Sequence, residues 1–333
     1  MAVRPFSQLT VLLLAVACNN PGAAPPAAAQ AEAQTAPPPQ PVAKPVTKPT
    51  AKPAPPPSAS AAPVASAKPE KPEIPDDMLP VPGGTFTMGA DDEGEQDERP
   101  AHKVTIKGFL LDKTEVTNAA YLECVQAKVC KPYREGVAAA MKYGSDREFR
   151  HPNQPVVGVS WTDAKTYCEW RGKRLPREAE WERAARGDDG REYPWGNEPP
   201  DKNKHGAFAG AKNGTTVDVG SYPDGRGPYG HFDLAGNVWE WTEDMYDPYA
   251  YKRPTASEGK PGSCDEILAA LNELRRNHQQ GYTGTNPIPA ECEHVLRGGA
   301  FNYRPQGLRA SNRVHHPGGF RILVAGFRCA KDM

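Results

Sequence analysis

The first quarter of the chain lacks the side chains from which a hydrophobic core is built. Residues 21–80 contain no phenylalanine, tryptophan or tyrosine and consist mostly of proline, alanine, lysine, serine, threonine, valine and glutamine. A segment without an apolar face cannot offset the entropy lost on ordering. All six tryptophans and all twelve tyrosines follow it. We therefore predict a disordered tether over residues 18–78 and one folded domain over residues 79–333.

Several classes of motif are also missing. The sequence has no phosphate-binding loop, no serine-nucleophile motif and no His-Glu-x-x-His helix. No short cysteine pair repeats at zinc-finger spacing, which argues against a zinc site. The 40 Lys and Arg nearly balance the 41 Asp and Glu, and they are scattered. This balance gives no electrostatic reason to expect a nucleic-acid partner.

The N-terminus has the features of an export signal. Arg4 precedes an apolar run, Leu9 to Ala17, that is too short to span a bilayer and that ends at Cys18. We predict a signal peptide over residues 1–17 and a lipidated Cys18, although an ordinary secretory signal with an incidental cysteine is the alternative. The expected location is the cell envelope, on a lipid anchor in the membrane, facing the periplasm or the exterior.

Local patterns predict a mixture of helices and strands. Residues 81–89 and 103–111 alternate as strands do. Helix starts are indicated by a cap at Thr117, by capping boxes at Ser160 with Asp163 and at Ser263 with Glu266, and by Pro176 in a first turn.

Six cysteines remain beyond Cys18, an even number in a chain expected to enter an oxidising compartment. Fifteen pairings are open from the sequence alone. Cys124 and Cys130 are close enough for a local loop. A bond between Cys264 and Cys292 would close a loop of about 28 residues and contribute about 3 kcal/mol.

Eight phrases occur in an order that resembles one known family. They are Val81-Pro82-Gly83-Gly84 with Met88-Gly89, Glu115-Val116-Thr117-Asn118, Pro155-Val156 through Val159-Ser160-Trp161, Gly172-Lys173-Arg174-Leu175-Pro176 with Glu178-Ala179-Glu180-Trp181-Glu182, Pro194-Trp195-Gly196, Asp233 through Trp241, Arg297-Gly298-Gly299-Ala300-Phe301, and Gly326-Phe327-Arg328-Cys329. The order resembles the formylglycine-generating enzymes, also called sulfatase-modifying factors. The resemblance implies an α+β, C-type-lectin-like fold with much irregular backbone.

The resemblance also implies a disulfide and a lost catalytic centre. The core disulfide of the family falls on Cys168 and Cys329, which leaves Cys124 with Cys130 and Cys264 with Cys292. The enzymes of the family bind Cu(I) through two thiolates placed after the Arg-Gly-Gly motif. Tyr303 and Leu308 occupy these positions here. We therefore expect no copper, and the segment resembles the cysteine-less branch of the family.

Calcium is the cofactor that the resemblance implies. Asp233 and Glu240 would supply side-chain oxygens, and Gly236 and Val238 would supply main-chain oxygens, which suit a hard cation. The alternative is that Asp233 caps a turn and Glu240 is solvated.

The function expected from these observations is a non-catalytic binding or scaffold module. Its ligand groove would contain Asn302, Tyr303, Arg304, Arg309 and Arg313 and would contact an envelope protein, a peptide or a glycan. The alternative for these arginines is structural ion pairing.

Two other functions stay open. One is a formylglycine-generating or other oxygen-dependent oxidase, in which the adjacent His315 and His316 would be candidate metal ligands. Adjacent residues on a strand point to opposite faces, which argues against a shared metal. The other is an accessory lipoprotein of surface or motility machinery.

Overall fold

The computed structural model describes residues 75–333, apart from residue 93 and residues 134–148, 211–213, 277–288 and 290. The expected signal peptide, Cys18 and nearly all of the tether lie outside the described residues. Within the described part, no helix combines the length and the apolar character needed to cross a membrane.

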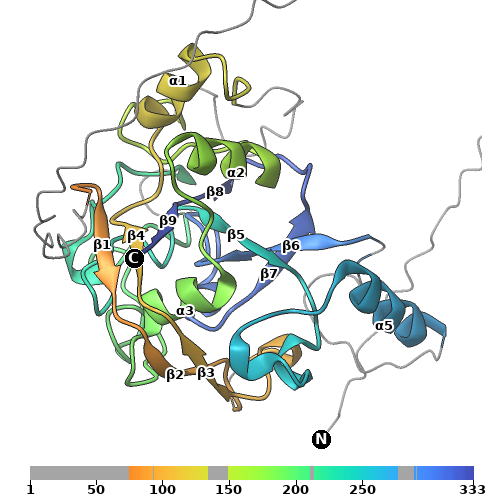
Figure 1. The fold of residues 1–333 in the computed structure, drawn as a ribbon. Coiled ribbons are helices and arrows are strands. Elements are labelled where there is room, and N and C mark those ends of the chain that lie inside the picture. Colours follow the sequence, from red (N-terminus) through yellow and green to blue (C-terminus); the bar gives the residue numbers. More distant parts are fainter. Residues whose placement is uncertain (1–74, 93, 134–148, 211–213, 277–288, 290) are drawn as a thin grey trace, which may run out of the picture. The chain divides into compact units, whose positions relative to one another are not determined.

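The strands within the described ranges form three sheets (Figure 1). The first sheet has the order β1 (Met78–Val81), β4 (Phe109–Asp112), β9 (Ala330–Asp332), and the second pairs β2 (Gly84–Met88) with β3 (His102–Ile106). The third has the order β7 (Val314–Pro317), β6 (Glu293–Arg297), β5 (Trp239–Met245), β8 (Ala325–Gly326). β9 pairs antiparallel with β4, so the last strand lies beside an early one. The extended stretch predicted over residues 103–111 is therefore two strands of different sheets.

Four α-helices of the described residues accompany the sheets: α1 (Asn118–Gln126), α2 (Trp161–Trp170), α3 (Glu178–Arg186) and α5 (Cys264–Arg276). The hydroxyl of Thr117 accepts the Ala120 N–H at 3.2 Å, as the sequence predicts. Ser160 and Asp163 form the predicted capping box at α2. The helix predicted to begin at Pro176 instead begins at Glu178.

The capping of α3 explains this shift. Arg177 is the N-cap residue, and its backbone N–H donates to the Glu180 carboxylate at 2.9 Å. Gly187 ends the helix with a φ of +68°, a backbone conformation that favours glycine.

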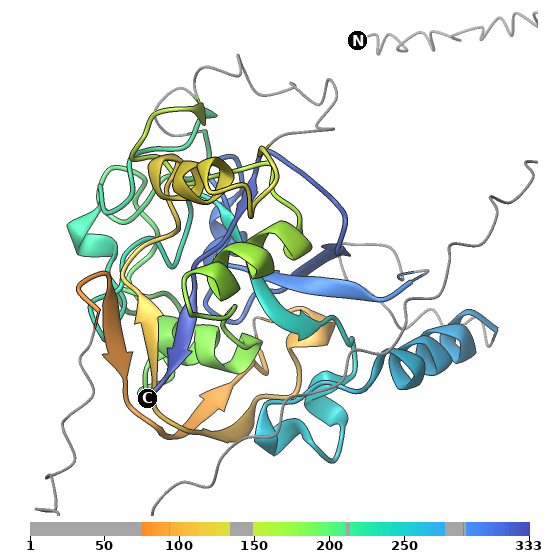
Figure 2. The same cartoon turned by 45° about the horizontal axis from the view of Figure 1, so that its top comes forward.

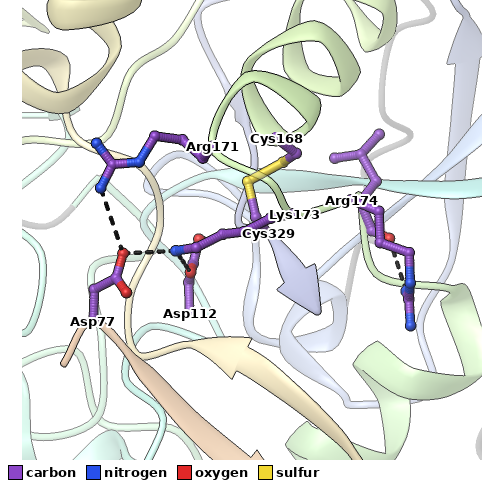
Figure 3. The surroundings of a disulfide bond; sticks show 8 residues. Asp77, Asp112, Cys168, Arg171, Lys173, Arg174 and Cys329 are labelled. Carbon is purple, nitrogen blue, oxygen red and sulfur yellow. Dashed lines mark hydrogen bonds and ion pairs between the residues drawn. A yellow bond between two sulfur atoms is a disulfide. The ribbon is translucent and has the colours of Figure 1, made fainter. Parts of the chain in front are cut away.

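The largest buried cluster lies where α1 and α2 pack against the third sheet, and its large rings include Trp239, Trp241, Phe301 and Phe327. The disulfide Cys168–Cys329 joins α2 to the segment before β9 (Figure 3). Beside it, the ammonium of Lys173 lies 2.6 Å from carboxylate oxygens of both Asp77 and Asp112. These contacts fix the C-terminal segment to the start of the domain.

The structure also contains the other two expected disulfides, Cys124–Cys130 and Cys264–Cys292. The second holds α5, where Ser263 and Glu266 make the predicted capping contacts. Ile267 and Leu271 of this helix pack against Met245 and Tyr249. Both views show α5 at the periphery, away from the third sheet's centre (Figure 1; Figure 2).

Candidate functional site

The chain after β6 turns sharply and returns to the start of β5. Gly298 and Gly299 both have positive φ values, +98° and +79°. A Cβ on Gly299 would stand 2.8 Å from Leu308 Cδ2 and 2.9 Å from the Gly307 carbonyl oxygen, so only glycine fits. The turn places the ring of Tyr303 edge-on against Trp239, with ring centroids 5.0 Å apart.

A cavity of about 510 Å³ lies beside these two rings. Its wall includes Trp239, Asn302, Tyr303, Arg304, Gln306 and Asn312. Tyr303 is 37 % exposed, whereas Trp239 is 1 % exposed. Two buried polar atoms of this wall, Nε1 of Trp239 and Oδ1 of Asn302, have no hydrogen-bond partner. An unpartnered buried polar atom costs about 1–3 kcal/mol, which makes these two atoms candidates for contact with a ligand.

The two positions at which the sequence resemblance predicts the lost thiolates have different surroundings. Tyr303 lines the cavity, but Leu308 is fully buried and packs in a cluster with Tyr193, Phe208 and Ala235. Every cysteine of the described residues is in a disulfide. No described cysteine is therefore free to bind Cu(I) or to attack a substrate.

Arg309 and Arg313 do not line the cavity. The Arg309 guanidinium donates to both Glu98 oxygens, at 2.8 and 2.7 Å, and Arg313 donates to both Glu178 oxygens, at 2.7 and 3.0 Å. Burial alone would raise the pKa of Glu98, but the hydrogen bonds and charge of Arg309 hold this pKa below its ordinary value. The two arginines form the structural ion pairs of the alternative interpretation. The predicted groove keeps Asn302, Tyr303 and Arg304 only.

A further buried arginine links the end of β6 to α3. Arg297 donates to Glu178 at 2.8 Å, to Glu182 at 2.5 Å and to the Ala310 carbonyl at 2.5 Å. Its guanidinium also lies 5.5 Å from the centre of the Trp181 ring. Arg297 thus holds both sides of the turn that carries Tyr303, which makes it a positioning residue.

One acid next to this network carries an unfavourable charge. Asp244 accepts the Glu178 N–H at 2.7 Å and is 8 % exposed. Burial raises its pKa to about 7, and the nearby negative charges of Glu178 and Glu180 act in the same direction, while Arg177 opposes them.

The oxygen atoms predicted to bind calcium lie in an acidic, buried part of the domain. Glu240 is fully buried rather than solvated, and its carboxylate accepts from Arg328 at 2.6 and 2.7 Å and from Trp181 Nε1 at 2.9 Å. Asp233 accepts the Gly220 N–H at 2.6 Å. Burial, and then the charges of Asp233 and Glu240, raise the pKa of the nearby Glu115 well above its ordinary value.

The charges around Asp233 and Glu240 bear on whether a calcium ion suits this site. Three buried carboxylates face one guanidinium, and Oε1 of Glu115 has no hydrogen-bond partner. The raised pKa of Glu115 favours its neutral form, and Arg328 offsets the charge of Glu240, so Asp233 supplies the negative oxygens that suit a divalent hard cation. The described residues hold no group of three or more Asp, Glu, His or Cys side chains arranged for a metal, so calcium at this site stays a prediction.

His315 and His316 point apart, as expected for neighbours on a strand. His315 lies 2.5 Å from the Glu293 carboxylate and stacks on Tyr246, with ring centroids 3.8 Å apart. His316 instead packs against Phe320, at 4.7 Å. The two imidazoles therefore do not share one metal.

Trp239, Gln306 and Asn312 line the cavity, although they are not among the predicted groove residues. Trp239 belongs to one of the eight phrases, which is a signal that could have drawn attention to it. Gln306 and Asn312 have no such signal, because the folding of the segment after β6 brings them to the cavity.

Comparison with known proteins agrees with the motif order. The family of the sulfatase-modifying factor enzyme 1-like domain matches residues 63–333. The chain belongs to this family. The formylglycine-generating enzyme of Streptomyces coelicolor is 33% identical to it over 336 aligned residues, which cover 82% of this chain and 96% of that enzyme.

Other members of the family show different contexts for the domain. The serine/threonine-protein kinase pkn1 of Chlamydia pneumoniae is 36% identical over 276 residues, which cover 80% of this chain. The chain spans only 39% of the length of that kinase. A Bos taurus protein named inactive C-alpha-formylglycine-generating enzyme 2 is 36% identical over 214 residues, which cover 51% of this chain and 71% of that protein.

Solved structures show the same fold. PvdO from Pseudomonas aeruginosa superposes with a TM-score of 0.57 at 28% identity, over 77% of this chain and 94% of that one. Treponema denticola variable protein 1 gives a TM-score of 0.56 at 20% identity, over 77% of this chain and 95% of that one. The second likeness concerns the fold alone.

Proposed function

We propose that this protein is a non-catalytic binding module of the cell envelope and that the cavity beside Trp239 and Tyr303 is its ligand site. The observation that carries the proposal is the replacement of both thiolate positions: a phenol lines the cavity and a buried isobutyl group fills the second place. Neither group binds Cu(I), which prefers soft sulfur ligands. The existence of a relative that is itself named inactive supports the same conclusion.

The envelope location rests on the sequence. A short apolar run ends at Cys18, and a proline-rich segment follows it, as expected for a lipid anchor and its spacer. In this proposal the tether carries the domain away from the membrane, so that the cavity meets a ligand of the envelope.

Calcium has a structural role in this proposal. Asp233 and Glu240 would hold the ion with the carbonyl oxygens of Gly236 and Val238. Bound there, the cation would act with Arg328 to offset the negative charge of Asp233 and Glu240. Asp233 has a φ of +56°, unusual for a residue other than glycine, and a ligand that fixes this turn stabilises that backbone conformation.

The catalytic test uses a cysteine-containing sulfatase-motif peptide. The purified full-length protein is incubated with the peptide, oxygen and copper, and mass spectrometry measures conversion of the cysteine to formylglycine. The Streptomyces coelicolor enzyme, assayed in parallel, shows that the peptide and the conditions support turnover. We expect no conversion above the protein-free background. Turnover comparable with that enzyme would show that the protein is an oxidase.

A further inference from the structure

The cavity beside Tyr303 contains one unpartnered donor and one unpartnered acceptor. The indole N–H of Trp239 has no acceptor, and Oδ1 of Asn302 has no donor. Cζ2, on the same edge of the indole as Nε1, lies 3.9 Å from where a Cβ on Gly307, another residue of the cavity wall, would stand. An amide, which both accepts and donates, can satisfy an unpartnered donor and an unpartnered acceptor together.

We propose, on the basis of the binding function above, that the cavity binds the acetamido group of an N-acetylated amino sugar. The acetamido oxygen accepts from Trp239 Nε1, and the acetamido N–H donates to Asn302 Oδ1. Both protein atoms are out of contact with solvent in the free protein. Entry of the ligand therefore includes rotation of the exposed Tyr303 ring, which covers the indole edge-on at 5.0 Å.

The rest of the cavity favours a sugar over a peptide. Arg304, Gln306 and Asn312 carry planar groups with several N–H donors, which suit the many hydroxyl groups of a sugar. The ring of Tyr303 offers a face for the C–H side of a pyranose. A peptide bound by strand addition needs an exposed strand edge, and β7, the edge strand of the third sheet, reaches the cavity only through Val314.

The binding experiment compares three probes by isothermal titration with the full-length protein. N,N′,N″-triacetylchitotriose carries the acetamido groups, cellotriose has hydroxyl groups in their place, and a blocked trialanine peptide carries amides without a sugar ring. We expect triacetylchitotriose to bind at least tenfold more tightly than either of the others. Equal binding of cellotriose, tighter binding of the peptide, or no binding of triacetylchitotriose would overturn the acetamido assignment.

One variant and a matched control test whether the sugar binds in this cavity. Asn302→Ala removes the acceptor and should weaken triacetylchitotriose at least tenfold. The matched control is Asn203→Ala, which removes an exposed asparagine from the wall of a different cavity, also of about 510 Å³, and should leave the affinity unchanged. Unchanged binding by Asn302→Ala would contradict the proposal.

Gly307→Val provides a second, independent obstruction. A Cβ at this position would meet Tyr303 Cδ1 at 3.6 Å and Trp239 Cζ2 at 3.9 Å, which are ordinary contacts, so the fold should tolerate the change. The rest of the valine side chain would project from the cavity wall beside the two rings, narrow the cavity and should abolish sugar binding. Retained binding in this variant would place the sugar elsewhere and refute the assignment. Failure of sugar binding is distinguishable from failure of the proposed non-catalytic role, which peptide oxidation or stoichiometric Cu(I) binding would contradict.

Discussion

Replacing Arg309 by methionine tests whether this arginine is structural. The guanidinium makes two hydrogen bonds, at 2.7 and 2.8 Å, to a fully buried Glu98 carboxylate, which otherwise accepts from Asn312 at 3.2 Å. Removing one partner of a buried ion pair leaves the other charge uncompensated and costs about 3–5 kcal/mol. We expect Arg309→Met to lower the free energy of unfolding by that amount, measured by urea denaturation followed by circular dichroism.

Two companion variants make the measurement specific. Arg304→Met changes an exposed arginine five positions away, and its effect should stay within about 0.5 kcal/mol. The double variant Glu98→Met with Arg309→Met removes both charges together and should recover most of the lost stability, because paired apolar replacements avoid an unpaired buried charge. If Arg309→Met cost no more than Arg304→Met, the arginine would not be part of a structural ion pair.

Two further changes address pH dependence and the disulfides. The pKa of Asp244, raised from 3.8 to about 7, means that the native state keeps a proton that the unfolded state loses, so unfolding free energy falls as pH rises from 4 to 7. In the Asp244→Asn variant the fall in unfolding free energy between these pH values, measured by urea denaturation, should be smaller by on the order of 4 kcal/mol, because each pKa unit corresponds to about 1.4 kcal/mol. An unchanged pH profile would refute the assignment. Cys168→Ala with Cys329→Ala opens a loop of 161 residues and should cost about 5 kcal/mol, against about 2 kcal/mol for the 6-residue loop of Cys124–Cys130. Equal losses of thermal stability in the two double variants would contradict this ranking.

Helix starts could be predicted from the sequence because the groups that determine them are close along the chain. Thr117 caps α1 through a residue three positions later, and Ser160 does the same for α2. Sheet order depends on distant contacts instead. β9 pairs with β4 across more than 200 residues, and no local pattern in either strand specifies that partner.

The residues of the candidate site likewise include some that the sequence could identify and some that depend on distant contacts. The motif order located Asn302, Tyr303 and Arg304, which do line the cavity. It also suggested Arg309 and Arg313, whose acidic partners Glu98 and Glu178 lie 211 and 135 residues away in the sequence. Only the folded structure shows that these two guanidinium groups are already bound.

Copper binding tests the central claim most directly. The full-length protein is titrated with Cu(I) in competition with a coloured Cu(I) chelator, with the Streptomyces coelicolor formylglycine-generating enzyme as the positive control. Because the thiolate positions hold Tyr303 and Leu308 and the described cysteines are paired, we predict no stoichiometric copper in this protein. One equivalent of tightly bound Cu(I), lost on substitution of Tyr303, would contradict the account.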